Sequence, residues 1–469
     1  MVDARPSKRV RNRLGAILAG LGLLVTLAVQ PASAITFDRA DDGTVTPPSD
    51  TACPTIDTPL PLEAWFNIED MEKRGFYDPK NHLPWDFATK VAQVICGAKE
   101  NSKIKVGMYF IRALGTMTAA SLGDRPESDP EVIYDALEYV KKKRNVQIGL
   151  VLDGGTITPR SARSLITKRL SNIASTYWCD NGCMNINAAS VYPYAINHEK
   201  FLTISDTLWK NDAAGAHPAV LSSSGNWARS QVRNYLQEAS LIYDDKKLFE
   251  QFSVRYDAMK YCATSGCSSS SGFPAPLSLS KQRGIWVDNF YRHYTDAGRG
   301  TTVSFSPQPP DVRDFYVQQF DDVDCSVDNK IRIAMFKLTD SKAQQMVEAL
   351  VRVKNRGCDI KMLLTQQGGS TTISPTVVKL LSDANISTKC TAVAMHTKMI
   401  LIGPQTNNNG RVLYGTANMS TAGLRYSEEH IITLDTRRAS TKYQEYIRRV
   451  YGEYMAGWYE LSQGSKTCQ

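Results

Sequence analysis

One pattern of polar residues occurs twice in this chain, and the repeat restricts the folds that the sequence can adopt. In each copy a His-x-Lys triplet opens an apolar run, a small-residue turn ends in Asn, and an acidic residue begins the next predicted strand. The first copy consists of His198, Lys200, Asn226 and Glu238, and the second of His396, Lys398, Asn418 and Glu429. Two sparse polar groups of one kind predict an internal duplication that builds one composite site.

The segments around the two copies follow the same order. In the first half, hydrophobic periodicity predicts helices over 85–99 and 130–143, with strands over 103–112, 145–152, 198–204 and 238–243. In the second half it predicts a helix over 341–356, with strands over 331–338, 359–364, 396–402 and 429–434. This alternation predicts an α/β fold with two lobes related by pseudo-twofold symmetry, each a mixed sheet flanked by helices. The predicted register aligns Glu238 with Glu429, because an Asp follows each of them six residues later.

The length of 469 residues also favours two lobes over one core. A Ser-rich stretch with neighbouring prolines lies near the middle, and we expect a linker over 266–290. The linker would divide an N-terminal lobe, 35–265, from a C-terminal lobe, 291–469.

The first 34 residues have the pattern of a secretory signal peptide. A basic region to Arg13 precedes an apolar run, and Ala32-Ser33-Ala34 supplies a cleavage site. A retained membrane anchor is the alternative, because the apolar run approaches spanning length. We therefore expect a secreted, extracellular protein. These residues carry about half of the formal net charge of +8, so the remaining chain is only weakly basic and does not by itself indicate a nucleic-acid partner.

All ten cysteines lie after residue 34, which fits five disulfides in an oxidising compartment. Their spacing predicts pairing of Cys179 with Cys183 and of Cys262 with Cys267 and leaves the other pairings open. Zinc binding through Cys179 and Cys183 is the alternative, but no Cys/His pair follows at zinc-finger spacing.

The doubled set of imidazole, ammonium and amide groups suits chemistry on a phosphodiester. Lysines and amide donors can hold the non-bridging oxygens and stabilise charge on a pentacoordinate phosphorus. One neutral imidazole can attack phosphorus while the other, protonated, gives its proton to the departing oxygen. Glu238 and Glu429 would set the tautomers if they reach the far ring nitrogens. We expect no metal and no cofactor, because the two lysines supply the positive charge.

The two copies resemble the paired motifs of the phospholipase D superfamily. The turn Gly415-Thr416-Ala417-Asn418 is similar to the family's Gly-Ser-x-Asn pattern, and Phe305-Ser306-Pro307 also resembles the family. The resemblance spans most of residues 100–435. It implies a phosphohistidine intermediate, with His198 as nucleophile and His396 as general acid.

The main departure from the family is a missing Asp five residues after each motif Lys. Ser205 and Gly403 occupy those places, and Asp206 lies one position late in the first copy. Tyrosyl-DNA phosphodiesterases, a branch of the same superfamily, also lack this Asp and are active, so its absence does not imply an inactive protein.

Three functions stay open from the sequence. The first is a secreted, monomeric hydrolase of phospholipids or related phosphodiesters with transient contact to a membrane surface. The second is a metal-independent endonuclease using the same pocket, with nucleic acid as its substrate and the basic residues 141–144 and 437–438 as candidate contacts. The third is an inactive binder of phosphorylated ligands. Nearby residues are expected to be structural rather than catalytic: His430 facing away from the site, His217 at the surface, and Tyr192, Tyr194 and Trp227 in packing.

Overall fold

The computed structural model describes residue 53 and residues 59–67, 86–111, 130–155, 160–180, 182–184, 195–209, 215–228, 235–265, 294–308, 312–365, 373–391, 394–404 and 410–468. The predicted signal peptide, the linker, Cys267, Tyr192 and Tyr194 lie outside the described residues. The described strands form two mixed sheets within one compact unit.

The first sheet has seven strands in the order β1-β7-β6-β5-β2-β3-β4. Strands β2, β3 and β4 are parallel, and the others pair antiparallel. The strands are β1 (Leu62–Phe66), β2 (Lys103–Met108), β3 (Gln147–Asp153), β4 (Ser175–Cys179), β5 (Lys200–Ile204), β6 (Ala219–Ser223) and β7 (Glu238–Tyr243).

The second sheet repeats this order and adds one edge strand. Its order is β12-β11-β10-β13-β14-β15-β9-β8, and β10, β11 and β12 are again the parallel strands. The strands are β8 (Tyr294–Asp296), β9 (Arg299–Ser306), β10 (Lys330–Met335), β11 (Asp359–Thr365), β12 (Ser387–Thr391), β13 (Lys398–Gly403), β14 (Arg411–Gly415) and β15 (Glu429–Ala439). Strand for strand, the two sheets match, as an internal duplication requires.

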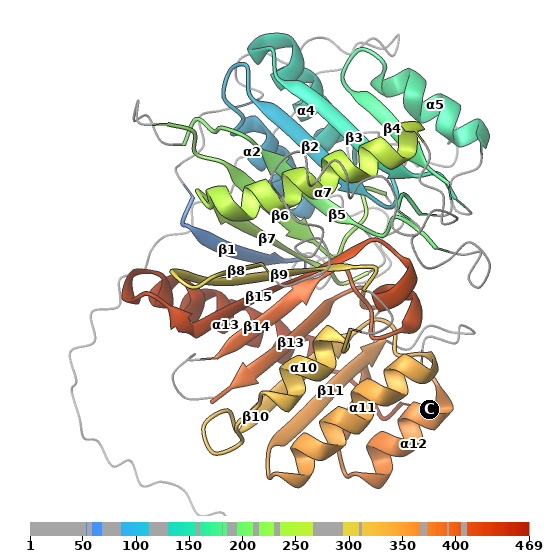
Figure 1. Ribbon diagram of the computed structural model, residues 1–469, viewed down its shortest axis with the longest axis vertical. Helices are drawn as coiled ribbons and strands as arrows, with labels where there is room; N and C mark the ends of the chain where they lie inside the picture. The colour runs from blue at the N-terminus through green and yellow to red at the C-terminus, as the bar shows by residue number, and fades with distance from the viewer. Residues whose placement is uncertain are drawn as a thin grey trace, which may run out of the picture. The chain divides into compact units, whose positions relative to one another are not determined.

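Helices flank both sheets (Figure 1). The buried apolar residues of the described helices and strands form three clusters. The helices of the N-terminal half are α2 (Asp86–Cys96), α4 (Pro130–Arg144), α5 (Arg160–Leu170) and α7 (Lys246–Ser265). Those of the C-terminal half are α10 (Phe315–Asp321), α11 (Asp340–Asn355), α12 (Pro375–Asp383) and α13 (Thr441–Ser462), with a π-helical turn, η3 (Ala422–Tyr426). The outer helices pack on one face of each sheet, and α7 and α13 share a core with the other faces. The predicted α/β fold with two mixed sheets flanked by helices is confirmed.

Local sequence explains why these elements form where they do. Helix α4 begins at Pro130, whose fixed φ suits a first helical position, and ends in four basic residues that complement the helix dipole. Helix α11 buries Met346, Leu350 and Val353 on one face, the residues that its periodicity predicts. Strand β3 is a buried apolar run between two parallel neighbours, which is the environment such runs favour.

The two halves are joined by two short pairs of extended backbone. Asn197 pairs in parallel with Glu428, and Leu236 pairs in parallel with Met395. In the first pair the His198 N–H donates to the Glu428 carbonyl at 3.0 Å, and in the second the His396 N–H donates to the Leu236 carbonyl at 2.7 Å. Each pair joins the segment ahead of a motif His to the segment ahead of an acidic strand in the other half.

Four disulfides lie wholly within the described residues. The predicted pair Cys179–Cys183 is confirmed, and three pairings that the sequence left open are Cys53–Cys96, Cys325–Cys358 and Cys390–Cys468. The predicted partner of Cys262 lies outside the described residues. The Cys390–Cys468 bond ties the end of the chain to β12 of the second sheet.

The double variant C390S/C468S tests this tie. The bond closes a loop of 78 residues, and loop-closure entropy predicts that its removal lowers the free energy of unfolding by about 4 kcal/mol. Urea unfolding followed by tryptophan fluorescence measures the change. A loss below about 1 kcal/mol would contradict the prediction.

Candidate active site

The motif residues of both halves converge where the strand ends of the two sheets face each other. His198 and His396 lie two residues before β5 and β13 begin, rather than within those strands as predicted, and Lys200 and Lys398 are the first residues of the strands. The centroids of the two imidazole rings lie 6.2 Å apart, with their planes inclined at 61°. The structure therefore brings both copies of the pattern into one place.

His198 forms a dyad with a carboxylate of the other half. Its Nδ1 lies 2.7 Å from Oε2 of Glu429, and both side chains are buried. The backbone pair between Asn197 and Glu428 holds the two segments in register, one residue away. A carboxylate on Nδ1 fixes the ring orientation and leaves Nε2 directed away from it, which is the arrangement that activates a nucleophilic imidazole.

His396 has a different partner. Its Nδ1 lies 2.6 Å from the carbonyl oxygen of Ser224, which can only accept, so Nδ1 carries a proton and Nε2 has the free lone pair. The predicted orienting role of Glu238 on an imidazole is wrong in this geometry, because no hydrogen bond joins Glu238 to either motif His among the described residues. The Glu238 carboxylate instead accepts from the Ser224 hydroxyl at 2.7 Å and also bonds Thr397.

A one-residue shift in register explains this asymmetry. The Ser224 N–H donates to the Glu238 carbonyl, and in the other half the Thr416 N–H donates to the His430 carbonyl. Glu238 is thus equivalent to His430, and Gln237 is equivalent to Glu429, so the predicted alignment of Glu238 with Glu429 is wrong by one position. Neighbouring residues of a strand face opposite sides, and a shift of one therefore turns the Glu238 carboxylate away from the site.

Gln237 is the residue that sequence reasoning missed. It is completely buried, and neither polar atom of its amide has a hydrogen-bond partner within the described residues. A Cβ at Gly225 would lie 2.1 Å from Gln237 Oε1, so only glycine leaves room for this amide in the Asn226 turn. The signal in the sequence was the extra residue between the Asn turn and the acidic residue in the first copy.

The two lysines occupy equivalent positions. Lys200 Nζ donates to the His198 carbonyl at 2.8 Å, and Lys398 Nζ donates to the His396 carbonyl at 2.6 Å. Each ammonium also lies over an aromatic ring, Tyr109 at 5.2 Å for Lys200 and Phe336 at 5.0 Å for Lys398. The same rings contact the motif histidines, with centroid separations of 4.9 Å for Tyr109–His198 and 4.6 Å for Phe336–His396.

Burial controls the protonation of these groups. It lowers the pKa of His198 and of His396 well below the usual value, and the two lysine charges act in the same direction. Burial also lowers the pKa of Lys200, and it lowers the pKa of Lys398 to about 7. Burial raises the pKa of Glu429 well above its usual value, and the charges of Lys200 and Lys398 oppose this rise.

The amides of Asn226 and Asn418 complete the doubled set. Both asparagines are buried in turns that follow β6 and β14, and each turn is closed by a bond from the N–H two residues on to the Asn carbonyl. Behind the histidines, Asp153 and Thr365 end the equivalent strands β3 and β11. Asp153 accepts from the Asn197 N–H at 2.9 Å, and Thr365 accepts from the Met395 N–H at 3.0 Å, which positions the residue before each motif His.

Other residues considered at the sequence level lie away from the chemistry. Asp206 accepts from the His217 N–H and pairs with Lys99, so it stabilises a turn and does not replace the family's Asp. The prediction of a surface position for His217 is wrong: the residue is buried and bonds Asp244 at 2.9 Å. Trp227 is buried in the core of the first lobe, and His430 faces Glu199, away from the motif histidines.

The His, Cys, Asp and Glu side chains of the described residues form no group of three that could hold a metal ion. No helix in the described part of the chain is long and apolar enough to cross a membrane.

Comparison with known proteins relates the second copy of the pattern to a family. The sequence model described as "Cardiolipin synthase, PLD-like domain" matches residues 326–451, which contain the second copy of the pattern. The chain carries a phospholipase D-like domain. This match supports the predicted enzyme class, a phosphoric diester hydrolase of the phospholipase D-like type. A search of curated protein sequences finds no significant match.

One solved structure extends the likeness in fold to both halves, and two others are reported beside it. Phosphatidylserine synthase from Haemophilus influenzae is 10% identical, with 82% of this chain and 85% of that chain covered at a TM-score of 0.54. Nuc, a phospholipase D family member from Salmonella typhimurium, is 16% identical, with 36% of this chain and 97% of that chain covered at a TM-score of 0.28. Yeast tyrosyl-DNA phosphodiesterase is 11% identical, with 74% of this chain and 87% of that chain covered at a TM-score of 0.42. The first likeness shows the phospholipase D fold, and the predicted resemblance to the superfamily is confirmed.

The electrostatics of the site can be tested without a substrate. Because burial and two neighbouring lysines oppose imidazolium formation, His198 and His396 are expected to titrate well below pH 6.5 in the free protein. Nitrogen-15 NMR of the six histidines follows each titration, with H198Q and H396Q variants to assign the signals. Titration of both rings at or above pH 6.5 would contradict the prediction.

Proposed function

We propose that this protein is a secreted phosphodiesterase that cleaves phospholipids or related small phosphodiesters through a phosphohistidine intermediate. One observation carries the proposal: two His–Lys sets from opposite halves meet with their rings 6.2 Å apart, and only one ring is bonded to a carboxylate. That spacing leaves room for a single phosphoryl group between an attacking and a departing oxygen or nitrogen.

In the proposed first step, Nε2 of His198 attacks phosphorus. A nitrogen–phosphorus bond forms, the bond to the leaving alcohol breaks, and the ring keeps its proton on Nδ1, so that the Glu429 carboxylate accepts from it and stabilises the positive ring. His396 gives a proton to the departing oxygen. Burial and the nearby lysine charges lower the pKa of His396 in the free protein, and the entering phosphodiester anion favours its protonation because it offsets the lysine charges.

In the second step His396 acts as a base. It takes a proton from water, the water oxygen bonds to phosphorus, and the bond to His198 breaks to release the phosphomonoester. Lys200, Lys398 and the amides of Asn226 and Asn418 would hold the non-bridging oxygens in both steps. Together with His198, His396 and the acceptor Glu429, these residues form the proposed catalytic machinery.

The placement of basic residues favours a small phosphodiester over a nucleic acid. Residues 141–144 end helix α4 beside the start of β3, about 20 Å along that strand from its site-facing end. Arg437 lies eight residues along β15 from Glu429, roughly 25 Å away, and it bonds Asp328 and Asp435. Neither predicted basic group therefore lines the site.

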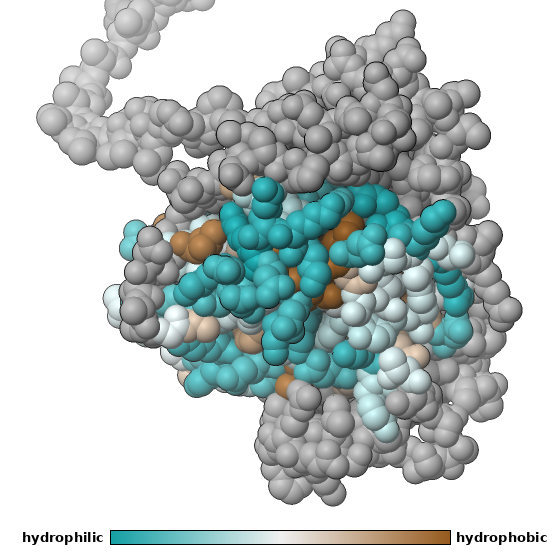
Figure 2. Space-filling model, turned by 90° about the horizontal axis from the view of Figure 1, so that it is seen from above, coloured by the Kyte–Doolittle hydropathy of each residue, from teal (hydrophilic) through white to brown (hydrophobic). Residues whose placement is uncertain are grey.

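The proposed membrane contact would be transient. Four large apolar side chains are exposed on the described surface, Leu60, Leu208, Val327 and Tyr459. Figure 2 shows mostly hydrophilic residues, with small separate apolar areas, over the described part of the face seen from above. Such a surface suits contact with lipid head groups rather than insertion into the hydrocarbon.

A substrate assay tests the proposal. Exported protein is incubated with phosphatidylcholine vesicles and separately with single-stranded DNA, each with and without EDTA. We expect head-group release that EDTA does not change and that H198A reduces by at least about 10³-fold, because the nucleophile is lost. The control H217Q changes a buried His remote from the site and should retain activity. Cleavage of DNA alone would replace the proposal with a nuclease, and no turnover of either substrate would support the inactive binder.

The pH dependence of kcat/KM tests the role of Lys398. Because burial lowers the pKa of Lys398 to about 7, the cation is present below that pH and is lost above it, so kcat/KM is expected to fall as pH rises through 7. On the acid side activity should persist below pH 6.5, since His198 stays neutral there. The variant K398R keeps its charge and should move the falling limb to higher pH. An unchanged limb in K398R would exclude Lys398 as its cause.

A further inference from the structure

A second cross-lobe pair lies directly behind the His198–Glu429 dyad. Glu199 follows His198 and His430 follows Glu429, and neighbouring residues of an extended chain face opposite sides. Nδ1 of His430 lies 2.5 Å from Oε2 of Glu199, and neither side chain has any exposed surface. The two halves therefore exchange His-to-Glu contacts twice, once in the site and once behind it.

This inner pair is anchored at both ends. Arg255 of α7 donates from Nε to Oε1 of Glu199 at 3.0 Å, and it also bonds the Ser306 carbonyl of the other half. The Ser222 hydroxyl lies 2.7 Å from Nε2 of His430. Burial raises the pKa of Glu199, but His430 and Arg255 outweigh it and hold that pKa below its usual value, so the buried carboxylate is charged.

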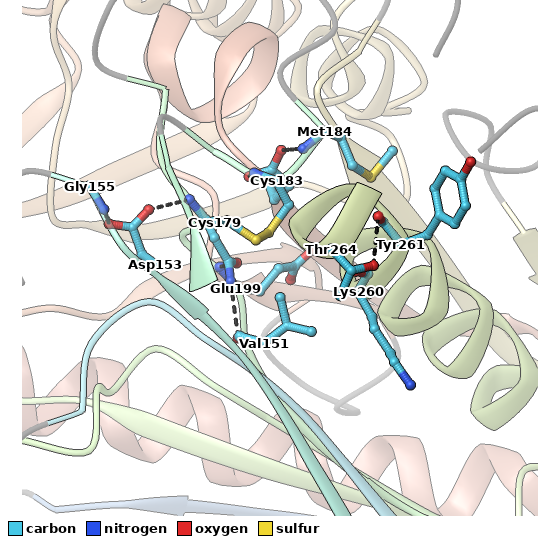
Figure 3. Close-up of a disulfide and its surroundings, with 12 residues drawn as sticks. Val151, Asp153, Gly155, Cys179, Cys183, Met184, Glu199, Lys260, Tyr261 and Thr264 are labelled. Atoms are coloured by element: carbon cyan, nitrogen blue, oxygen red, sulfur yellow. Dashed lines mark hydrogen bonds between the residues drawn. A yellow bond between two sulfur atoms is a disulfide. The ribbon is translucent and has the colours of Figure 1, made fainter. Parts of the chain in front are cut away.

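A third buried carboxylate supports the same segments. Glu428 accepts the His198 N–H through its carbonyl, while its carboxylate accepts from the N–H groups of Cys183 at 3.0 Å and Met184 at 2.7 Å. These two residues lie at the Cys179–Cys183 disulfide, and Figure 3 shows them with that bond. Sδ of Met184 in turn lies 3.2 Å from Nη1 of Arg255. The supports of His198 and Glu429 thus form one connected network.

The second half of the site has a simpler support. When the two halves are aligned by their strand register, Leu236 occupies the position equivalent to Glu428. The pair Thr397–Glu238 is equivalent to Glu199–His430. A carboxylate bonded to both an arginine and a histidine is therefore particular to the His198 side. Burying such charges contributes little net stability compared with apolar packing, so stability does not explain the arrangement.

We propose that Glu199 and His430 are a positioning pair that holds the backbones on either side so that Glu429 Oε2 stays in hydrogen-bond contact with His198 Nδ1. The pair acts through the dyad and touches no substrate. This inference rests on the proposed function for its kinetic consequence, but its structural consequence, the orientation of His198, can be measured without turnover.

The test uses E199Q, H430Q and the milder S222A in the full-length protein. We expect E199Q and H430Q to lower kcat for bis(4-nitrophenyl) phosphate about 10- to 100-fold, with KM within about twofold, because binding groups remain in place. The double variant should be no slower than the slower single variant, because both remove one interaction. In nitrogen-15 NMR, the hydrogen-bonded Nδ1 signal of His198 should weaken in each variant.

The matched control is D328N. Asp328 is also a fully buried carboxylate bonded to an arginine, but it precedes β10, whose opposite end faces the site. D328N should lower stability in urea while retaining kcat and the His198 signal. S222A removes only the hydroxyl beside Nε2 of His430, so it can be measured even if E199Q and H430Q do not fold. Its kcat should fall about threefold or more.

The outcomes separate the inference from the proposed function. If E199Q folds and retains both kcat and the His198 signal, the positioning role is wrong. If the wild-type protein turns over no phosphodiester, the proposed function fails, and the NMR comparison of E199Q with D328N still decides the positioning role. If D328N loses the His198 signal as much as E199Q does, the loss reflects general destabilisation. That result would also overturn the inference.

Discussion

The whole site depends on the pairing of extended backbone between the two halves. Asn197 with Glu428, and Leu236 with Met395, are the contacts that bring each motif His beside a strand start of the other half. Without them neither half has a complete set of groups, because the carboxylate on His198 comes from β15 of the second sheet. Dividing one site between two lobes makes its geometry a property of their interface.

The pairing also makes two similar halves chemically different. A one-residue offset before the acidic strand gives His198 a carboxylate and leaves His396 with a backbone carbonyl. A ring that must carry a phosphoryl group gains from a carboxylate beside Nδ1, whereas a ring that must exchange protons in both directions is better served by a neutral acceptor. Duplication thus supplies two imidazoles, and the difference in register gives one the role of nucleophile and the other that of acid and base.

Much of this architecture could be predicted from the sequence, because it follows from periodicity and repetition. Strands β3 and β11, helix α11 and the two His-x-Lys strand starts need only local patterns, and these predictions hold within a few residues. The register of Glu238 had one weak signal in the sequence, the extra residue before it, because a slip of one residue leaves the apolar pattern of β7 nearly unchanged and cross-strand bonds are needed to establish it. The role of Glu199 had no local signal, since its partners Arg255 and His430 lie far along the chain.

The central claim is that both halves build one site in which His198 alone becomes phosphorylated. Rapid quenching of H396N with bis(4-nitrophenyl) phosphate tests it most directly, because this leaving group departs without an acid whereas hydrolysis of the intermediate needs His396 as base. The account predicts up to one phosphoryl group per chain, on His198, by peptide mass spectrometry. Absence of phosphate on His198 in H396N, or phosphate on His396 in the wild-type protein, would contradict it.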